Sequence, residues 1–407
     1  MEKIKKPLLR FRGFTDTWEQ CKFKDLFVKL QNNSLSRADL NDENGYAMNV
    51  HYGDVLIKFN EILDVNNENI PYITEPGIIE KYKSSFLQNG DIIIADAAED
   101  NTVGKCCEIA GLSHEIVLAG LHTIPCRPSK NFASGYLGYY MNSNVYHDQL
   151  LPLIQGSKIS SISINTLANT SLVYPKSIEE QLLLANKFRA LDSIITLHQR
   201  KYDKLVNVKK ALLDKMFPKN GEVVPKLRFK GFNETWEQRE LESLTIKLDN
   251  LRVPVSEVDR VPGPTPYYGA NGIQGYVQGY THKGEFILVA EDGANDLKNY
   301  PVQYVNGEVW VNNHAHVLQG KLDFADTRYL GYAISQTNIE PFLVGGGRAK
   351  LNASTMMKIM ISSPQNTQEQ QRIGSLFDSI DSLITLHQCK YDQLIRIKKA
   401  LLQKMFV

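Results

Sequence analysis

The chain has 407 residues, enough for two or three domains that each bury a core. Hydrophobic residues make up 43% and charged residues 22%, as in ordinary soluble proteins, and the net charge of +1 excludes a histone-like polycation but not a local basic groove. No apolar run approaches the roughly 18–20 residues of a membrane span, and the five cysteines, which form no CxxC pair, favour reduced thiols in a cytoplasmic protein over disulfides or a zinc site.

A short arm of basic and aromatic residues begins the chain and returns later. PLLRFRGFTDTWEQ spans Pro7–Gln20 and PKLRFKGFNETWEQ spans Pro225–Gln238, with ten of fourteen positions identical. Trp18 and Trp236 take the same place in both arms. We interpret them as core anchors, where each arm docks on its own domain, rather than as binding residues. The repeat indicates that the chain is built twice.

The regions that follow the arms differ between the two halves. Residues about 30–175 and 245–364 share almost nothing by eye. Both contain short β-branched or aromatic runs opened by glycine turns, such as GDIIIAD at Gly90–Asp96 and GEFILVAEDG at Gly284–Gly293. The pattern predicts two unlike, strand-rich domains.

Each variable region leads into a near-identical segment with helical periodicity. Leu191–Phe217 and Ile380–Phe406 share nineteen of twenty-seven residues at an offset of 189. Apolar residues on alternating three- and four-residue steps predict two long helices, each the natural coiled-coil partner of the other. The predicted seam consists of Phe188, Leu191, Ile195, Tyr202 and Leu205 in the first helix and Phe377, Ile380, Ile384, Tyr391 and Leu394 in the second.

Other residues of these helices do not fit the seam. Lys209 and Lys398 interrupt it at equivalent positions. A further apolar set lies off the seam and must contact a globular region or another protein. This set comprises Ile194, Leu197 and Val208 in the first helix and Leu383, Leu386 and Ile397 in the second.

The helix starts and the linker suggest where the parts begin and end. Ser177 with Glu180, and Thr367 with Gln370, predict a capping box at the start of each helix. We therefore expect an arm and first domain at 1–175, a helix at 176–217, a linker at 218–226, a second arm and domain at 227–364, and a helix at 365–407.

Motifs for catalysis or metal binding are not apparent. GGGRAK lacks the spacing of a phosphate-binding loop, and the HEIVL run at His114–Leu118 lacks the second histidine of a zinc site. The sequence also lacks the Asn/Asp-Pro-Pro-aromatic loop of amino-methyltransferases. His198 and His387 recur, but they lie on the seam, where we interpret them as packing residues. We expect no catalytic residue and no metal site.

The repeated frame resembles the specificity subunit of type I DNA restriction-modification systems. The resemblance covers essentially the whole chain. It rests on the arms at Arg10–Trp18 and Arg228–Trp236, the P-x-x-x-(E/Q)-x-Q entries at Pro175–Gln181 and Pro364–Gln370, and the KKALLxKMF endings at Lys209–Phe217 and Lys398–Phe406.

The resemblance implies an α+β fold with internal pseudo-twofold symmetry. Two target-recognition domains would be joined by an antiparallel coiled coil, and each domain would read one half of a split sequence in double-stranded DNA. Two modification (methyltransferase) subunits and two ATP-dependent restriction subunits are the implied partners. The chain itself would bind no cofactor, since S-adenosylmethionine, ATP and Mg would belong to the partner subunits.

Candidate DNA contacts come from two glycine-containing loops. Gly156, Ser157 and Lys158 form one, and the other, Gly345–Lys350, holds Arg348 and Lys350. Small residues permit close approach to DNA and cations bind phosphates, although an ordinary surface turn explains the same pattern. Weaker candidates at strand ends are Arg127, Lys58, Asn295, Asn312, Asn313, His314 and His316.

Two other classes of function compete with DNA reading. A coiled-coil scaffold that binds only proteins would share the long helices, but it has no reason to vary two domains on a constant frame. An enzyme with an unrecognised site would need an acid–base cluster that the sequence does not show. The expected function is therefore non-catalytic DNA recognition.

Overall fold

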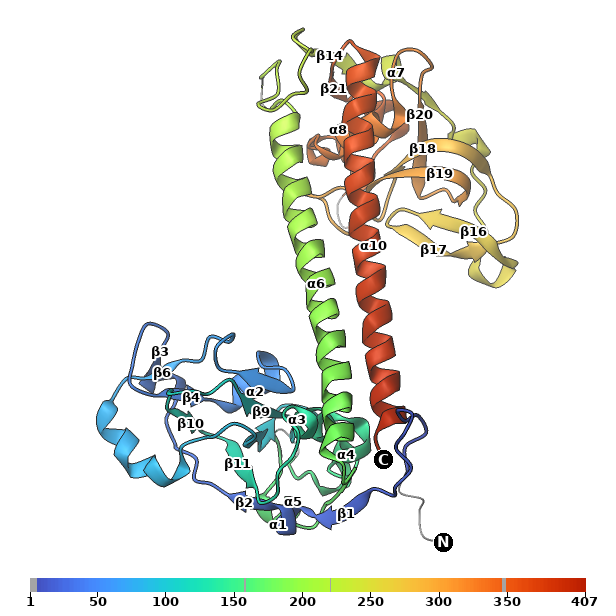
Figure 1. Cartoon of the computed structure of the whole chain (residues 1–407). Coiled ribbons are helices and arrows are strands. Elements are labelled where there is room, and N and C mark those ends of the chain that lie inside the picture. Colours follow the sequence, from blue (N-terminus) through green and yellow to red (C-terminus); the bar gives the residue numbers. More distant parts are fainter. Residues whose placement is uncertain (1–5, 157–158, 220, 346–348) are drawn as a thin grey trace. The chain divides into compact units, whose positions relative to one another are not determined.

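The computed structural model describes residues 6–156, 159–219, 221–345 and 349–407, and the chain divides into two compact units. The first unit comprises Met1–Leu197 and Lys390–Val407, and the second comprises His198–Cys389. Two 39-residue helices, α6 (Ile178–Met216) and α10 (Thr367–Met405), contribute one end to each unit (Figure 1). The predicted fold class, with two strand-rich units and two long helices, is confirmed.

The first unit is built on a five-stranded sheet with the order β2-β11-β7-β9-β5. Its central strand, β7, is fully buried because it consists of the apolar run Ile-Ile-Ile-Ala. A second sheet has the order β10-β4-β6-β3. The strands of the two sheets are β2 (Phe27–Lys29), β11 (Thr123–Pro128), β7 (Ile92–Ala95), β9 (Cys106–Ala110), β5 (Ile62–Asp64), β10 (Val117–Ala119), β4 (Met48–Val50), β6 (Tyr72–Ile73) and β3 (Leu40–Asn41).

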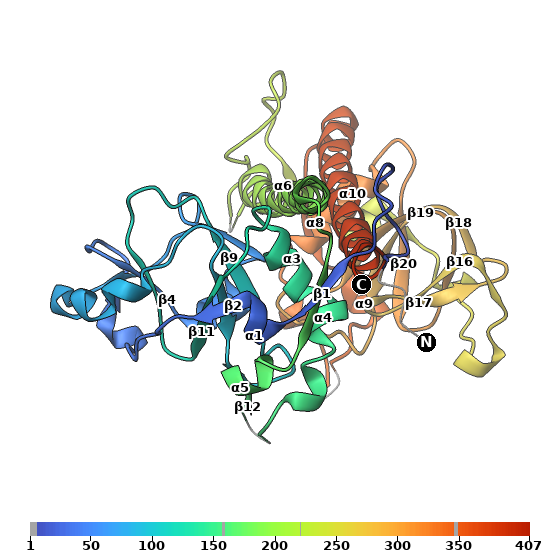
Figure 2. The ribbon, with the colours of Figure 1, turned by 60° about the horizontal axis from the view of Figure 1, so that its bottom comes forward.

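An aromatic helix joins the larger sheet to the long helices. Helix α3 (Tyr136–Asn142) packs on β9 (Figure 2). Its Tyr139 meets Phe188 of α6 with ring centroids 5.3 Å apart. Phe406, just beyond the end of α10, stacks on Phe188 at 5.5 Å. The short helices of this unit are α1 (Phe23–Leu26), α2 (Tyr52–Ile57), α4 (Asn144–His147) and α5 (Ile164–Leu167).

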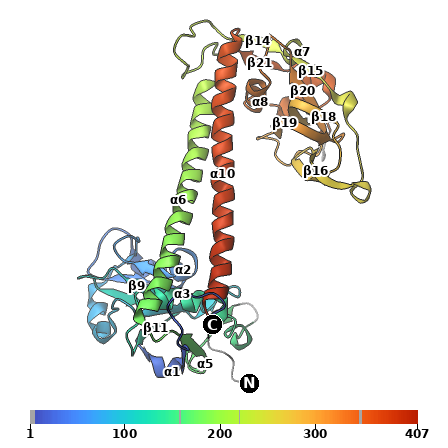
Figure 3. The same cartoon turned by 45° about the vertical axis from the view of Figure 1, so that its right-hand side comes forward.

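The second unit contains one six-stranded sheet with the order β15-β20-β18-β19-β16-β17. Helix α8 (Thr327–Ser335) packs on β18 and β19 (Figure 3). Its Tyr332 meets Phe377 of α10 with ring centroids 5.1 Å apart. The remaining elements are β15 (Thr245–Lys247), β20 (Ala315–Gly320), β18 (His282–Ala290), β19 (Val302–Val311), β16 (Pro262–Gly269), β17 (Gly272–Val277), α7 (Leu241–Leu244) and α9 (Ala353–Met356).

Each arm docks in the same way within its own unit. The Leu9 N–H donates to the Lys404 carbonyl near the end of α10, and the Leu227 N–H donates to the Lys215 carbonyl near the end of α6, both at 2.8 Å. Trp18 and Trp236 are each 2% exposed within the core, which confirms them as anchors. The arms continue into strand pairs, β1 (Glu19–Lys22) with β13 (Ser171–Tyr174) and β14 (Glu237–Glu240) with β21 (Met360–Ser363).

A buried ion pair ties each arm to the start of a long helix. Arg10 donates to both carboxylate oxygens of Glu180, at 2.6 and 2.8 Å, and Arg228 donates to both oxygens of Glu369, at 2.6 and 2.7 Å. The glutamate side chains are only 2% and 0% exposed. Two parallel hydrogen bonds from a planar guanidinium are among the strongest ionic contacts in proteins. The geometry therefore fixes the arm against the helix.

These pairs correct the two predicted capping boxes. Ser177 does accept the Glu180 N–H at 3.3 Å, but the Glu180 carboxylate binds Arg10 instead of returning to Ser177. In the second helix, Asn366 rather than Thr367 is the cap, and its side chain accepts the Gln368 N–H at 2.9 Å. Asparagine is among the best N-caps, which explains why Asn366 takes that place in the second helix. A buried carboxylate is strongly destabilised without a charged partner, so for Glu180 the contact with Arg10 outweighs a hydrogen bond to the N–H at the helix start.

The seam positions are covered in both units. Phe188, Leu191 and Ile195 are buried in the first unit, and Phe377 and Ile380 in the second. The start of α6 meets the end of α10 in the first unit, and the end of α6 meets the start of α10 in the second, so the helices run antiparallel. Tyr391 and Leu394 in the first unit, and Tyr202, Leu205 and Ile384 in the second, are partly buried.

The two lysines that interrupt the seam have matching ionic partners. Lys398 binds Asp192 at 2.6 Å, and Lys209 binds Asp381 at 2.5 Å. Each aspartate also accepts a tyrosine hydroxyl at 2.7 Å, from Tyr139 in the first unit and Tyr332 in the second. Through these aspartates, the lysines link the long helices to α3 and α8.

Placing a charge in the seam tests the coiled coil. Ile195→Asp buries an unpaired carboxylate at a position that is 9% exposed, so the free energy of unfolding should fall by about 3 kcal/mol. Ile194→Asp is the control, because Ile194 is 43% exposed and the change should cost less than about 0.5 kcal/mol. Urea unfolding of the purified chain measures both values, and equal losses would contradict the seam.

Removing one partner of an arm ion pair tests the docking. Arg10→Ala leaves the Glu180 carboxylate buried and unpaired, and should cost about 3–5 kcal/mol. Arg228→Ala should behave alike at Glu369, whereas Arg12→Ala, at an exposed position of the same arm, should be nearly neutral. Thermal unfolding of the three variants measures these losses of stability. An Arg10→Ala variant as stable as the wild type would show that the ion pair is dispensable.

Candidate nucleic-acid interface

The two units, although unlike in sequence, share the same geometry where two central strands end. In the first unit β7 pairs with β11 at Ala95 and Thr123, and the next residues continue the ladder, with the Asp96 N–H donating to the His122 carbonyl at 3.0 Å. In the second unit β18 pairs with β20 at Ala290 and Ala315.

The ladder of the second unit continues beyond these strands as well. The Glu291 N–H donates to the His314 carbonyl at 2.8 Å. His122 and His314 therefore hold equivalent positions, opposite an acidic residue in each unit.

The glycine-containing loops lie beside these strand ends. Gln155 bridges to Ser161 in the first unit, and Val344 bridges to Lys350 in the second. The loops are anchored by equivalent bonds, from the Ile162 N–H to the Asp96 carbonyl at 2.9 Å and from the Leu351 N–H to the Glu291 carbonyl at 2.7 Å. Both loops thus have seven residues at an offset of 189, so the shared frame extends further than the sequence identity.

Glycine is required where each loop begins. Gly156 has φ of 107° and Gly345 has φ of 94°, a region that other residues adopt only with strain. Ser157, Lys158 and Arg348 lie outside the described residues. We call the strand ends and loop of the first unit the first edge site, and those of the second unit the second edge site. The first edge site comprises Asp96, His122 and residues 155–156 and 159–161, and the second comprises Glu291, Asp292, His314 and residues 344–345 and 349–350.

Charged groups of both signs gather at the second edge site. Lys350 is 46% exposed and binds Glu291 at 3.0 Å, and Arg252 binds the same carboxylate at 2.8 Å. Although burial opposes it, the hydrogen bonds from Arg252 and Lys350 lower the pKa of Glu291. The site therefore holds a fixed anion that positions two cations, and Lys350 is the more exposed of them.

Two further candidates of the second unit are buried and hydrogen-bond to residues in or next to this site. His316 is 1% exposed, with Nδ1 bound to Asp249 at 2.7 Å and Nε2 to the Leu351 carbonyl at 2.9 Å. Asn312 is 4% exposed, and its side-chain oxygen accepts the His314 N–H at 2.8 Å. Both residues hold the site rather than line its surface.

Asn295 and Asn313 lie near the same edge. The Asn295 N–H donates to the Asn271 side chain at 3.0 Å, and the Asn271 amide donates to the Gly293 carbonyl at 2.9 Å. Asn313 directly precedes His314 and is exposed. The structure thus gathers most candidates of the second half at one place.

The other candidates of the first unit lie elsewhere. Arg127 is bound to both oxygens of Asp91, at 2.9 and 2.8 Å, and that hydrogen bonding raises the pKa of Arg127 despite burial. Lys58 is exposed at the end of α2, where it contacts the Asn69 carbonyl. Of the first-half candidates, only the Gly156 loop belongs to an edge site.

Sequence reasoning missed the acidic residues and His122. A signal was present, because the strand runs GDIIIAD and GEFILVAED both end in acidic residues. The later runs LHT and NHAHV both place a histidine before the neighbouring strand. The spacing between acid and histidine differs between the halves, so alignment by eye could not reveal the equivalence.

Comparison with known families identifies the frame. The family model for the type I restriction modification DNA specificity domain matches residues 15–207 and 233–396. A putative type I restriction enzyme specificity subunit from Haemophilus influenzae is 42% identical over 147 residues, which are 36% of this chain and 38% of that relative. The putative type I restriction enzyme MjaX specificity subunit of Methanocaldococcus jannaschii is 22% identical over 95% of this chain and 92% of its own.

A solved structure shares the fold. The type I restriction-modification S subunit from M. genitalium superposes with a TM-score of 0.72 and 13% identity, covering 99% of both chains. Among the described residues, no helix combines the length and the apolar character needed to cross a membrane. Because the family model matches both halves of the repeated frame, the chain belongs to the type I restriction-modification DNA specificity family.

Proposed function

We propose that this chain reads a split DNA sequence, one half with each unit, and directs partner subunits that modify and restrict DNA. The observation that carries the proposal is the pair of equivalent edge sites. Both hold a glycine-led loop of the same length against the same two strand ends, but the side chains differ. A constant frame with variable side chains is what two readers of different sequences require.

The antiparallel helices explain how the two half-sites would be spaced. Both α6 and α10 contribute residues to both units, and neither contains a proline. A continuous helix rises 1.5 Å per residue and resists bending. We propose that helix length sets the number of unspecified base pairs between the two halves of the target.

Two equivalent apolar sets support two copies of one partner. Ile194, Leu197 and Ile397 are exposed in the first unit, and the residues at an offset of 189, Leu383, Leu386 and Val208, are exposed in the second. Exposed apolar groups that recur in equivalent places mark protein interfaces. We propose one modification subunit on each set, with two restriction subunits joining the assembly.

This assignment leaves the chemistry to the partners. The modification subunits would bind S-adenosylmethionine, and the restriction subunits would bind ATP and Mg. The contribution of this chain is recognition, so we propose that it catalyses no step itself.

A domain exchange tests the division of labour. Replacing residues 245–364 with the equivalent region of a relative should change one half of the methylated sequence and leave the other half intact, because the first edge site is unaltered. Genome-wide mapping of methylated bases in cells that express the chimaera gives the result. A change in both halves or in neither would contradict independent readers, and unaltered methylation without the chain would favour a scaffold.

A single lysine tests the second edge site. Lys350→Ala should weaken DNA binding by the assembled complex. If Lys350 binds phosphate, the slope of log affinity against log salt should fall by about one; if it binds guanine, the loss should be roughly 1–3 kcal/mol at one base pair. The control is Lys283→Ala, since Lys283 pairs with Glu308 at 2.9 Å near the opposite end of β18. Equal effects of both changes would remove Lys350 from the interface.

A further inference from the structure

Each edge site contains a histidine held by a carboxylate. His122 Nδ1 lies 3.2 Å from Asp96 Oδ1 in the first unit, and His314 Nδ1 lies 2.6 Å from Asp292 Oδ1 in the second. The imidazoles are 51% and 38% exposed. Exposed rings at equivalent strand ends, with the same nitrogen held by the same kind of group, form a matched pair of sites.

The carboxylates do not come from equivalent positions. Asp96 corresponds to Glu291, because both donate their N–H to the carbonyl of the opposite histidine. Asp292 is one residue further along, where the first unit has Ala97. The two units therefore place an aspartate beside the histidine from different positions in the chain, so the repeated frame alone does not explain why both histidines have such a partner.

The backbone of His122 supports a functional role. Its φ of 54° makes it one of two non-glycine residues in the described part of the chain with positive φ. Positive φ costs a non-glycine residue free energy, and residues held in this conformation cluster at functional sites. Tyr52 meets the ring edge-on with centroids 5.3 Å apart, so the imidazole is also held from the side.

The hydrogen bond determines what the ring can offer. A carboxylate on Nδ1 accepts the Nδ1–H and leaves Nε2 for another partner. In the described residues, neither His122 nor His314 has a hydrogen bond at Nε2. A protonated ring would donate Nε2–H, while its positive charge would neutralise the adjacent aspartate.

We propose that His122 and His314 are equivalent DNA-contacting residues, one in each unit, which donate Nε2–H to hydrogen-bond acceptors of DNA while Asp96 and Asp292 hold Nδ1. This inference rests on the proposed function and assigns residues to it. The acceptors of matching chemistry are a phosphate oxygen and the major-groove acceptors of the bases, which are N7 of either purine, O6 of guanine and O4 of thymine.

The neighbouring charges are those of each edge site. Around His122 they are Asp96, His51 and the Arg37–Asp54 ion pair. Burial, together with the charge of Arg37, lowers the pKa of His51. Burial raises the pKa of Asp96 despite His122. Around His314 they are Asp292 and the Glu291 cluster with Lys350, Arg252 and His316.

The test uses the full chain assembled with the modification subunits of its host, and a duplex carrying the sequence found by methylation mapping. His122→Asn and His314→Asn keep an N–H for the aspartate, remove the Nε2 contact, and place at residue 122 a side chain that tolerates positive φ. Each change should weaken binding about tenfold. Wild-type affinity should rise as the pH falls from about 8 to about 6, and the double variant should lose most of that rise.

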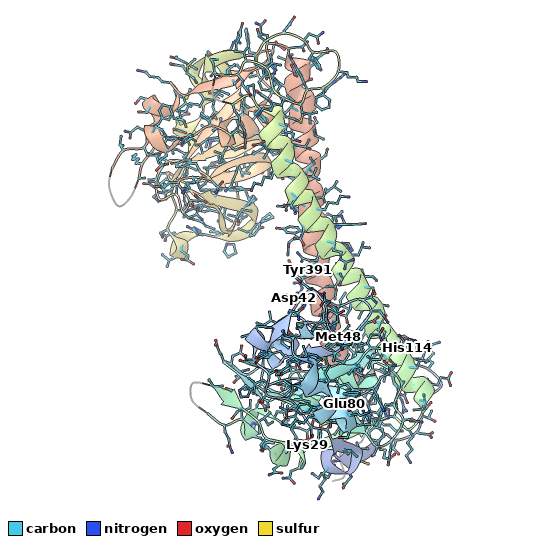
Figure 4. All side chains as sticks on the ribbon, turned by 90° about the vertical axis from the view of Figure 1, so that its left-hand side faces the viewer. Lys29, Asp42, Met48, Glu80, His114 and Tyr391 are labelled. Atoms are coloured by element: carbon cyan, nitrogen blue, oxygen red, sulfur yellow. The ribbon has the colours of Figure 1, made fainter. Side chains whose placement is uncertain are left out.

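His114→Asn is the matched control. His114 is an exposed histidine of the first unit (Figure 4). It lies before β10 in the chain, whereas His122 follows that strand. Its loss should change neither the affinity nor the pH dependence. Asp292→Ala serves as a second variant in case a histidine change impairs folding: it removes the acceptor that holds Nδ1 of His314, so the ring loses its fixed orientation and binding should weaken as in His314→Asn.

The outcomes separate the inference from the proposed function. A loss that is uniform over all duplexes identifies phosphate as the acceptor, and a loss confined to one base pair identifies a base atom as the acceptor; both support the contact. If the wild-type complex reads its sequence but the asparagine variants bind like it at every pH, the histidine assignment is wrong. If the wild-type complex shows no sequence preference, the proposed function fails instead.

Discussion

The phenylalanine that follows each long helix fills the core of the unit in which that helix ends. Phe406 packs against Phe188, Tyr136 and Tyr140 in the first unit, and Phe217 packs against Phe377, Tyr329 and Trp236 in the second. Burying such aromatic rings is worth several kcal/mol each. Because the first core needs a residue from the far end of the chain, the two helices must run antiparallel, and the folding of both units depends on that arrangement.

The ionic contacts add direction to this packing. A buried ion pair does not exceed an apolar pair in stability, but it rejects partners that lack the matching charge. Arg10 with Glu180, and Arg228 with Glu369, set where each arm enters. Lys398 with Asp192, and Lys209 with Asp381, align the helices with α3 and α8. The frame can thus repeat in detail while the sheets it carries diverge.

This separation leaves the edge sites free to vary in sequence without disturbing the repeated frame. The edge sites are attached to the frame by backbone hydrogen bonds, which any side chain permits. Glycine at the start of each loop supplies the required φ, and the residues that follow are free to differ. Under the proposed function, substitution within the loops and strand ends would change the DNA sequence that is read, while the exposed apolar sets of the long helices would stay constant.

The sequence by itself determined the parts that repeat. The near-identical arms and helices, with a regular apolar period over α6 and α10, revealed the two-fold construction, the seam and the family. Heptad spacing and sequence identity between the two halves can be read along the chain without knowledge of tertiary contacts. It also placed Trp18 and Trp236 in the core, since a tryptophan repeated within a conserved frame is most often an anchor.

Only the tertiary structure decided the contacts between residues far apart in the chain. The partner of Glu180 lies 170 residues away, so a local capping rule assigned that carboxylate wrongly. His122 and His314 became equivalent only when the pairing of β7 with β11 and of β18 with β20 was known. Strand register and long-range ion pairs depend on how the whole sheet is assembled, and that information is not contained in any short stretch of sequence.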